Sequence, residues 1–220
     1  MKSDKFKYIF VHIPKNAGSS IEHAMLSMEG IDASQGVNSL SSHLMKEFWV
    51  GGGNQHSTLD QYLSRGEYDN YFKFTVVRNP WDRMVSEYEY CRKGGDCRDL
   101  KCPYDFSEFC RKFTSGSLVG QGCANSEIYD THLPCQNEFF GEEIDFICRY
   151  ENLQKDFNIV CDRIGMPRYN LEVVNDTNRD RDYRKYYDDK TLELVSSFFS
   201  KDIFMFSYKF DPAVYEYVIV

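Results

Sequence analysis

The sequence predicts an α/β fold in which a central, mainly parallel sheet is flanked by helices. Short segments at 7–13, 71–77 and 144–150 are rich in apolar β-branched and aromatic residues, which is typical of buried strands. A segment with helical spacing follows each of them along the chain. Strands that alternate with helices favour a parallel sheet, because each helix returns the chain to the same edge. The length of 220 residues fits a single domain covering 1–220.

The ends of the predicted helices show residue types that favour caps. Ser19 or Ser20 is expected to cap the first helix and Ser57 the helix at 58–65, because a serine side chain accepts hydrogen bonds from the first N–H groups of a helix. Gly30 lies just beyond the first helix, where a glycine commonly ends it. The predicted helices are 20–29, 40–50, 58–65, 81–92, 105–113, 151–165 and 189–199.

Residues 91–135 form a predicted cysteine-rich insertion. They hold six of the eight cysteines of the chain. The start of the chain does not resemble a signal peptide, so these thiols are expected to be reduced, with one or two disulfides inside the insertion as the alternative. The spacing of the cysteines matches no CxxC pair, which disfavours a zinc site. The remaining two, Cys148 and Cys161, lie in segments that are expected to be buried.

The charge and the hydropathy of the chain narrow the classes of partner. A net charge of −8 argues against general nucleic-acid binding, which usually needs a basic surface. No apolar run approaches the length of a membrane span, and the short apolar run before Pro14 is typical of a first strand rather than of a signal peptide. These features predict a soluble, cytoplasmic protein and leave its oligomeric state open.

The first chemical motif is FVHIPKNAGSS at residues 10–20. A strand is followed by a turn, a lysine and small residues that open a helix, and this order favours an anion site at the helix start. The lysine precedes the glycine, so the segment is not the GxxxxGK[ST] loop of ATP-binding proteins. The alternative is an ordinary strand–helix turn with a surface lysine. The candidate ligand-binding residues are Pro14, Lys15, Asn16, Ala17, Gly18, Ser19 and Ser20.

The second motif is FTVVRNPWDRMVSEY at residues 74–88. Arg78 follows a predicted strand and Ser86 lies in the next helix, so both are candidates to bind a second phosphate. The alternative for Arg78 is an ion pair with Asp82. Arg83 is expected to form a surface pair with Glu87, four residues along the helix.

Together the two motifs resemble the sulfotransferase family that includes heparan sulfate 2-O-sulfotransferase and related carbohydrate sulfotransferases. The resemblance extends to 149–167 and 183–210. It implies a P-loop-like three-layer sandwich that binds 3′-phosphoadenosine-5′-phosphosulfate (PAPS). It also implies that the first motif binds the 5′-phosphosulfate, and that Arg78 and Ser86 bind the 3′-phosphate. The cysteine-rich insertion and the lack of a membrane anchor are departures from this family. They leave the identity of the acceptor and the cellular compartment open, but not the donor.

A histidine is the expected base for the acceptor hydroxyl. His56 lies on a loop between the two motifs, and its setting QHSTLDQYL resembles the segment that holds the base in this family. His12 either lines the site or belongs to the core, and His132 and Gln136 lie in the expected acceptor region. Lys15 would stabilise the oxygen that bridges sulfur and phosphorus, so the reaction requires no metal.

The sequence therefore predicts a PAPS-dependent sulfotransferase that moves a sulfuryl group in line to a hydroxyl acceptor, such as a saccharide or a small molecule. Two alternatives stay open: a nucleotide-dependent kinase with an atypical phosphate loop, and a nucleotide-binding module without catalysis. The charged segment 175–186 is either a solvated run or, as the resemblance implies, a lid over the nucleotide.

Overall fold

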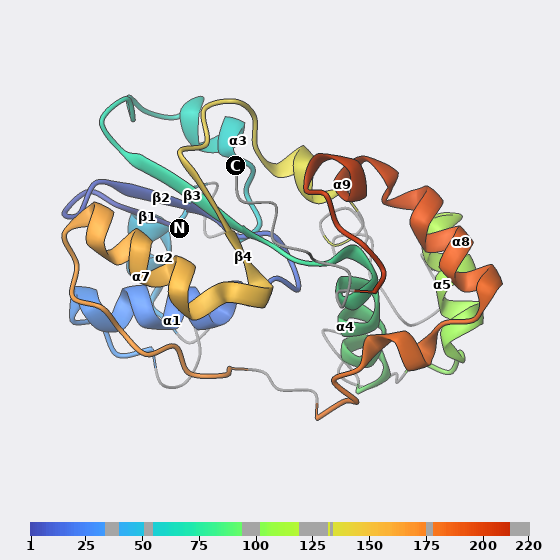
Figure 1. Cartoon of the computed structure of the whole chain (residues 1–220). Coiled ribbons are helices and arrows are strands. Elements are labelled where there is room, and N and C mark those ends of the chain that lie inside the picture. Colours follow the sequence, from blue (N-terminus) through green and yellow to red (C-terminus); the bar gives the residue numbers. More distant parts are fainter. Residues whose placement is uncertain are drawn as a thin grey trace. The chain divides into compact units, whose positions relative to one another are not determined.

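The computed structural model of the chain divides into two compact units, which are shown in Figure 1. Unit 1 comprises Met1–Val77 and Glu138–Asn175, and unit 2 comprises Arg78–Asn137 and Asp176–Val220. The first motif therefore lies in unit 1, and Arg78 is the first residue of unit 2. The structure describes residues 1–33, 40–50, 55–93, 102–118, 132, 134–174 and 178–211.

Unit 1 contains a four-stranded sheet with the order β1-β2-β3-β4. β2 pairs in parallel with β3, and β3 pairs in parallel with β4, whereas the short β1 is antiparallel to β2. The predicted α/β fold with a mainly parallel sheet is confirmed, and each predicted strand is present in shorter form. The strands are β1 (Lys2–Ser3), β2 (Tyr8–Val11), β3 (Phe72–Val77) and β4 (Phe146–Arg149).

Two long helices of unit 1 lie along the same side of the sheet (Figure 1). Ile21 of α1 and Phe157 of α7 belong to one buried apolar cluster with Phe10 and Phe74 of the central strands. Burial of these side chains is the main stabilising contribution in this unit. The described helices of unit 1 are α1 (Gly18–Glu29), α2 (Ser42–Phe48), α3 (Leu59–Leu63), η3 (Tyr150–Asn152) and α7 (Leu153–Ile164).

The helix ends confirm some of the predicted caps and correct others. Gly30 ends α1 with a positive φ of 85°, as predicted. Ser19 and Ser20 are not caps: α1 begins one residue earlier, after Ala17. Ser57 is not a cap either, because Thr58 takes this role. The Thr58 hydroxyl accepts from the Gln61 N–H at 3.3 Å, and the Gln61 side chain accepts from the Thr58 N–H at 3.0 Å. This reciprocal pair favours threonine over the preceding serine as the cap.

The described secondary structure of unit 2 consists of helices joined by loops. Asn79 caps α4 through its side-chain oxygen, which accepts from the Trp81 N–H at 3.1 Å, and Pro80 occupies the first helical position. Aromatic side chains such as Phe109 and Phe113 fill the interior of this unit. The helices are α4 (Pro80–Arg92), α5 (Phe106–Thr114), η2 (Gln136–Phe139), η4 (Tyr183–Tyr186), α8 (Asp189–Phe198) and α9 (Ser200–Met205), of which η2 begins in unit 2.

Much of the predicted insertion at 91–135 lies outside the described residues, and so do Cys97 and Cys123. Cys148 and Cys161 are fully buried, as predicted, and burial raises the pKa of both thiols. Free thiols are present at Cys91, Cys102, Cys110, Cys135, Cys148 and Cys161. Across the described residues, the helices are too short or too polar to span a bilayer.

Candidate functional site

The loop at 14–17 joins β2 to α1 and has an unusual backbone. Lys15 and Ala17 have φ angles of 68° and 64°, in the left-handed region that residues other than glycine rarely adopt. The loop is attached to the sheet by Asn16, whose side-chain Nδ2 donates to the Val76 carbonyl at 2.8 Å. Backbone strain of this kind persists only where the surrounding structure enforces it, and it is concentrated at active and ligand-binding sites.

Gly18 is the first residue of α1 and lies against the ring of His12. A Cβ atom at Gly18 would lie 2.0 Å from Cδ2 and 2.1 Å from Nε2 of that ring. No side chain accepts a hydrogen bond as the N-terminal cap of α1, because Ala17 occupies the cap position. The helix start therefore combines a positive dipole end with a small residue and the nearby Lys15, which suits an anion.

His12 is held by a buried carboxylate. Its Nδ1 lies 3.1 Å from Oε1 of Glu22, which is fully buried. Glu22 also accepts from Trp49 Nε1 at 2.9 Å and from Gln55 Nε2 at 2.8 Å. Burial on its own would raise the pKa of Glu22, but the attraction and hydrogen bonding of His12 outweigh it and lower the pKa. This geometry gives His12 a fixed orientation in the core next to the loop.

His56 is brought next to His12 although the two lie 44 positions apart in the chain. Its Nδ1 lies 3.2 Å from the His12 carbonyl oxygen, and the two rings meet edge to face at 4.6 Å. A carbonyl oxygen only accepts hydrogen bonds, so Nδ1 carries the proton in the neutral ring. Nε2 of His56 is then the atom that can accept a proton, as a general base requires.

Arg78, in unit 2, forms the ion pair that was the alternative to a ligand contact. Its Nε and Nη2 lie 2.8 and 2.7 Å from Oδ2 of Asp82. Gln136 holds the backbone of the same residue: Oε1 accepts from the Arg78 N–H at 2.8 Å, and Nε2 donates to the Arg78 carbonyl at 2.9 Å. Gln136 is fully buried, so this geometry fits a residue that positions Arg78. Ser86 is also buried, on α4.

Asp82 has a second cationic partner that the sequence did not single out. Nη2 of Arg179 is ion-paired with Oδ1 of Asp82, although the two residues lie 97 positions apart. The sequence marked the charged run 175–186 as a whole, and no spacing rule connects it to Asp82. Among the described residues, this ion pair joins Arg179 of the charged run 175–186 to Asp82 of the second motif.

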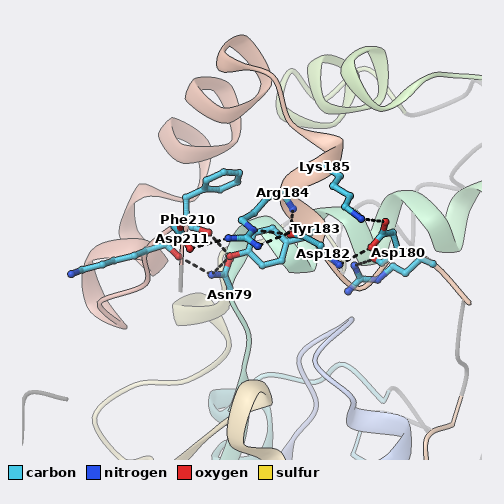
Figure 2. A network of polar contacts seen from close by, with 10 residues as sticks. Asn79, Asp180, Asp182, Tyr183, Arg184, Lys185, Phe210 and Asp211 are labelled. Atoms are coloured by element: carbon cyan, nitrogen blue, oxygen red, sulfur yellow. Dashed lines mark hydrogen bonds and ion pairs between the residues drawn. The ribbon is translucent and has the colours of Figure 1, made fainter. Parts of the chain in front are cut away.

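Other charges of this run pair with nearby acids (Figure 2). Arg184 donates to Asp182 at 2.7 Å and to Asp211 at 3.0 Å, and Lys185 donates to Asp180 at 2.8 Å. These side chains are substantially exposed. Their contacts fit the solvated charge run that the sequence offered as one alternative.

Arg83 corrects a prediction, because it does not lie on the surface. Arg83 and Glu87 are only 2% and 4% exposed. The Arg83 guanidinium donates to the carbonyls of His132 at 3.1 Å and Pro134 at 3.0 Å. Glu87 contacts Nδ1 of the buried His132 at 3.0 Å. Burial lowers the pKa of Arg83, so its contacts with carbonyls and nearby acids are needed to offset the lost hydration.

Among the described residues, His, Cys, Asp and Glu side chains do not gather into a group of three that could hold a metal ion. The described candidate residues thus form two separate groups, which are the loop at 14–17 with His12 and His56 in unit 1, and Arg78 with Asp82 and Arg179 in unit 2.

Comparison with known proteins gives a match over almost the whole chain. Residues 1–209 match the model of the sulfotransferase family. An uncharacterized protein of Archaeoglobus fulgidus is 30% identical over 118 residues, which cover 54% of this chain and 87% of that protein. Carbohydrate sulfotransferase 14 of Danio rerio is 24% identical over 188 residues, covering 76% of this chain and 48% of the relative. Carbohydrate sulfotransferase 9 of Homo sapiens is 24% identical over 239 residues, covering 93% and 52%. The match with these two named relatives spans about half of their length.

Proposed function

Because the chain belongs to the sulfotransferase family, we propose that it transfers a sulfuryl group from PAPS to a hydroxyl group of a carbohydrate or of a small molecule. The observation that supports this most directly is the strained loop at 14–17 before α1, with Lys15 in its left-handed turn. The names of two relatives, both carbohydrate sulfotransferases, favour a saccharide as the acceptor.

In this proposal the donor is bound at its two charged ends. Residues 14–20 bind the 5′-phosphosulfate through backbone N–H groups, the hydroxyls of Ser19 and Ser20, and the Lys15 ammonium. Arg78 and Ser86 bind the 3′-phosphate, where the planar guanidinium suits a phosphate group.

The reaction breaks one bond to sulfur as it forms another. The acceptor oxygen attacks sulfur in line with the bond from sulfur to the bridging oxygen. Nε2 of His56 takes the proton of the acceptor hydroxyl. The electron pair of the broken bond stays on the 5′-phosphate of adenosine 3′,5′-bisphosphate, which leaves. Lys15 stabilises the negative charge on that oxygen, so positioning and charge stabilisation provide the catalysis without a metal.

Transfer of labelled sulfate from PAPS to a panel of unsulfated saccharides and small hydroxyl compounds tests this function. His56→Ala is expected to lower kcat by about 10²–10⁴-fold, the usual contribution of a general base. Lys15→Ala is expected to cause a loss of similar size, because it removes charge stabilisation at the leaving oxygen. His43→Ala is the matched control, since His43 is an exposed histidine of α2.

Three results would contradict the proposal in different ways. Full transfer by the His56 and Lys15 variants would overturn the roles of these residues. Binding of adenosine 3′,5′-bisphosphate without transfer to any acceptor would favour a silent nucleotide-binding module. Selective thermal stabilisation by ATP and magnesium would favour the kinase alternative.

A further inference from the structure

Asp202 is a fully buried carboxylate on α9 that takes no part in the proposed reaction. Its Oδ2 accepts from the Gln136 N–H at 2.7 Å, and its Oδ1 accepts from the Asn137 N–H at 3.0 Å. These N–H groups belong to the first two residues of η2, so Asp202 caps that short helix from 66 and 65 positions along the chain. All three residues lie in unit 2.

Burial makes the carboxylate of Asp202 costly, and it raises the pKa of this group. The N–H groups of Gln136 and Asn137 and the charge of Arg83 oppose this rise. A buried acid is tolerated only where donors satisfy it. Gln136 supplies a further donor through its side chain, because its Nε2 lies 3.3 Å from Oδ2 of Asp202. Asp202 therefore holds both the backbone and the side chain of Gln136.

Gln136 uses both ends of its side-chain amide on the backbone of Arg78. Oε1 accepts from the Arg78 N–H at 2.8 Å, and Nε2 donates to the Arg78 carbonyl at 2.9 Å. Residues of two antiparallel strands pair through the same exchange of two hydrogen bonds. Arg78 directly follows β3, so the Gln136 side chain provides at this residue the kind of pairing that a neighbouring strand would provide.

Asp202 determines which way round the Gln136 amide lies. Nε2 has two hydrogens, and its two partners are the Arg78 carbonyl and the Asp202 carboxylate. A carboxylate only accepts hydrogen bonds, so Asp202 favours the orientation in which Nε2 faces it. In the reverse orientation, Oε1 would face two acceptors and Nε2 would face the Arg78 N–H, which would leave these buried groups unsatisfied.

We propose that Asp202 is a positioning residue of the site for the donor's 3′-phosphate: it orients Gln136, and Gln136 fixes the backbone of Arg78. This inference rests on the proposed function, in which the Arg78 guanidinium binds that phosphate. A fixed backbone determines the point from which the side chain extends, so less conformational freedom is lost when the phosphate binds. Asp202 acts through Gln136 and does not touch the nucleotide.

The test compares two nucleotides that differ only at the 3′ position. Calorimetry measures the Kd of 5′-AMP and that of adenosine 3′,5′-bisphosphate, and the first Kd divided by the second gives the selectivity for the 3′-phosphate. Asp202→Asn keeps the shape of the side chain but replaces one acceptor oxygen by a donor nitrogen, which would face an N–H group. The selectivity is expected to fall about tenfold, the effect of one weakened charge-assisted contact. The Kd of 5′-AMP should stay nearly unchanged.

Asp105→Ala is the matched control for lost stability. Asp105 caps α5 of the same unit, where its side chain accepts from the Glu108 N–H at 2.8 Å. Its removal should lower the Tm, as the loss of a helix cap does, without changing the selectivity. A fall of the selectivity as large as that in Asp202→Asn would show that general destabilisation is the cause and would overturn the inference.

A double-mutant cycle tests whether Asp202 acts through Gln136. Gln136→Met keeps an unbranched side chain of similar length but removes both amide contacts with Arg78, so it is expected to lower the selectivity too. Adding Asp202→Asn to Gln136→Met should then lower it little further. Independent losses that multiply in the double variant would overturn the proposed route. If Asp202→Asn does not fold, Gln136→Met decides, and an unchanged selectivity in that variant would overturn the inference.

The outcomes separate this inference from the proposed function. Failure of the unmodified protein to bind adenosine 3′,5′-bisphosphate would overturn both. A selectivity that Arg78→Gln reduces and Asp202→Asn leaves intact would overturn this inference alone. An equal loss of affinity for both nucleotides in Asp202→Asn would also overturn it, because that result indicates a structural role.

Discussion

Individual side chains decide the geometry around the loop at 14–17. Glu22 holds His12, the His12 ring lies against Gly18, and the His12 carbonyl orients His56. Each of these contacts is buried or partly buried, so it restricts the position of the next residue. The orientation of the proposed base therefore depends on its contact with His12, which Glu22 holds in place.

Gly18→Ala is expected to destabilise unit 1. The added methyl group would overlap the His12 ring, and overpacking of this kind costs about 1–3 kcal/mol. Urea denaturation would measure the loss in the free energy of unfolding. The control is the same substitution in a His12→Ala background, where the ring is absent and the cost should shrink. An equal cost in both backgrounds would show that the overlap is not its cause.

Glu22 is expected to make the stability of unit 1 sensitive to acid. Its pKa is lower in the folded protein than the ordinary value of 4.5, because His12 and its hydrogen bonds outweigh burial. A lowered carboxyl pKa stabilises the fold above the unfolded-state pKa, and this contribution is lost as the pH falls through the folded-state pKa.

The variant Glu22→Gln should therefore have a flatter acid limb in a plot of unfolding free energy against pH. The slope should fall by up to ~1.4 kcal/mol per pH unit below about pH 5, the limit for one proton. Denaturation at a series of pH values gives this slope, which is compared with that of Glu29→Gln, a second carboxylate on α1. The idea fails if the acid limb keeps its slope in Glu22→Gln.

At the scale of elements, the helix starts differ in a way that supports the anion site. Side chains cap several helices, namely α2, α3, α4, α5 and α8. α1 lacks such a cap, and its cap residue Ala17 is left-handed. α7 and α9 also lack one, but each continues directly from a preceding helical segment. A start without a side-chain cap after a strained loop is suited to accept an external anion instead.

Thr58→Ala is expected to lower the free energy of unfolding by about 1 kcal/mol, because it removes one half of the capping box of α3. Thermal or urea denaturation measures the change. Thr58→Ser, which retains the hydroxyl, serves as the control and should keep most of the stability. Equal losses in the two variants would show that the cap contributes little.

At the scale of the whole molecule, the family match covers both compact units, since it runs over residues 1–209. Lys15 and His56 belong to unit 1, and Arg78, Asp82 and Arg179 belong to unit 2. The chain passes from one unit to the other directly after β3, so Arg78 of the second motif directly follows a central strand of the sheet.

The sequence by itself determined the three parallel strands, the longer helices and the first motif, because their signals are local. Apolar, β-branched segments predicted the parallel strands, and Gly30 marked the end of α1. The order of lysine and glycine in FVHIPKNAGSS predicted an anion site without knowledge of distant contacts, because a helix start and its loop are neighbours in the chain.

Only the tertiary structure decided which side chains meet. Asp82 binds Arg179 across 97 positions, and no periodicity connects residues so far apart. Arg83 looked like an exposed helix residue because its four-residue spacing to Glu87 is typical of a surface pair, yet packing buries it against the His132 carbonyl. Burial and long-range pairing depend on the packing of whole elements, which local spacing does not specify.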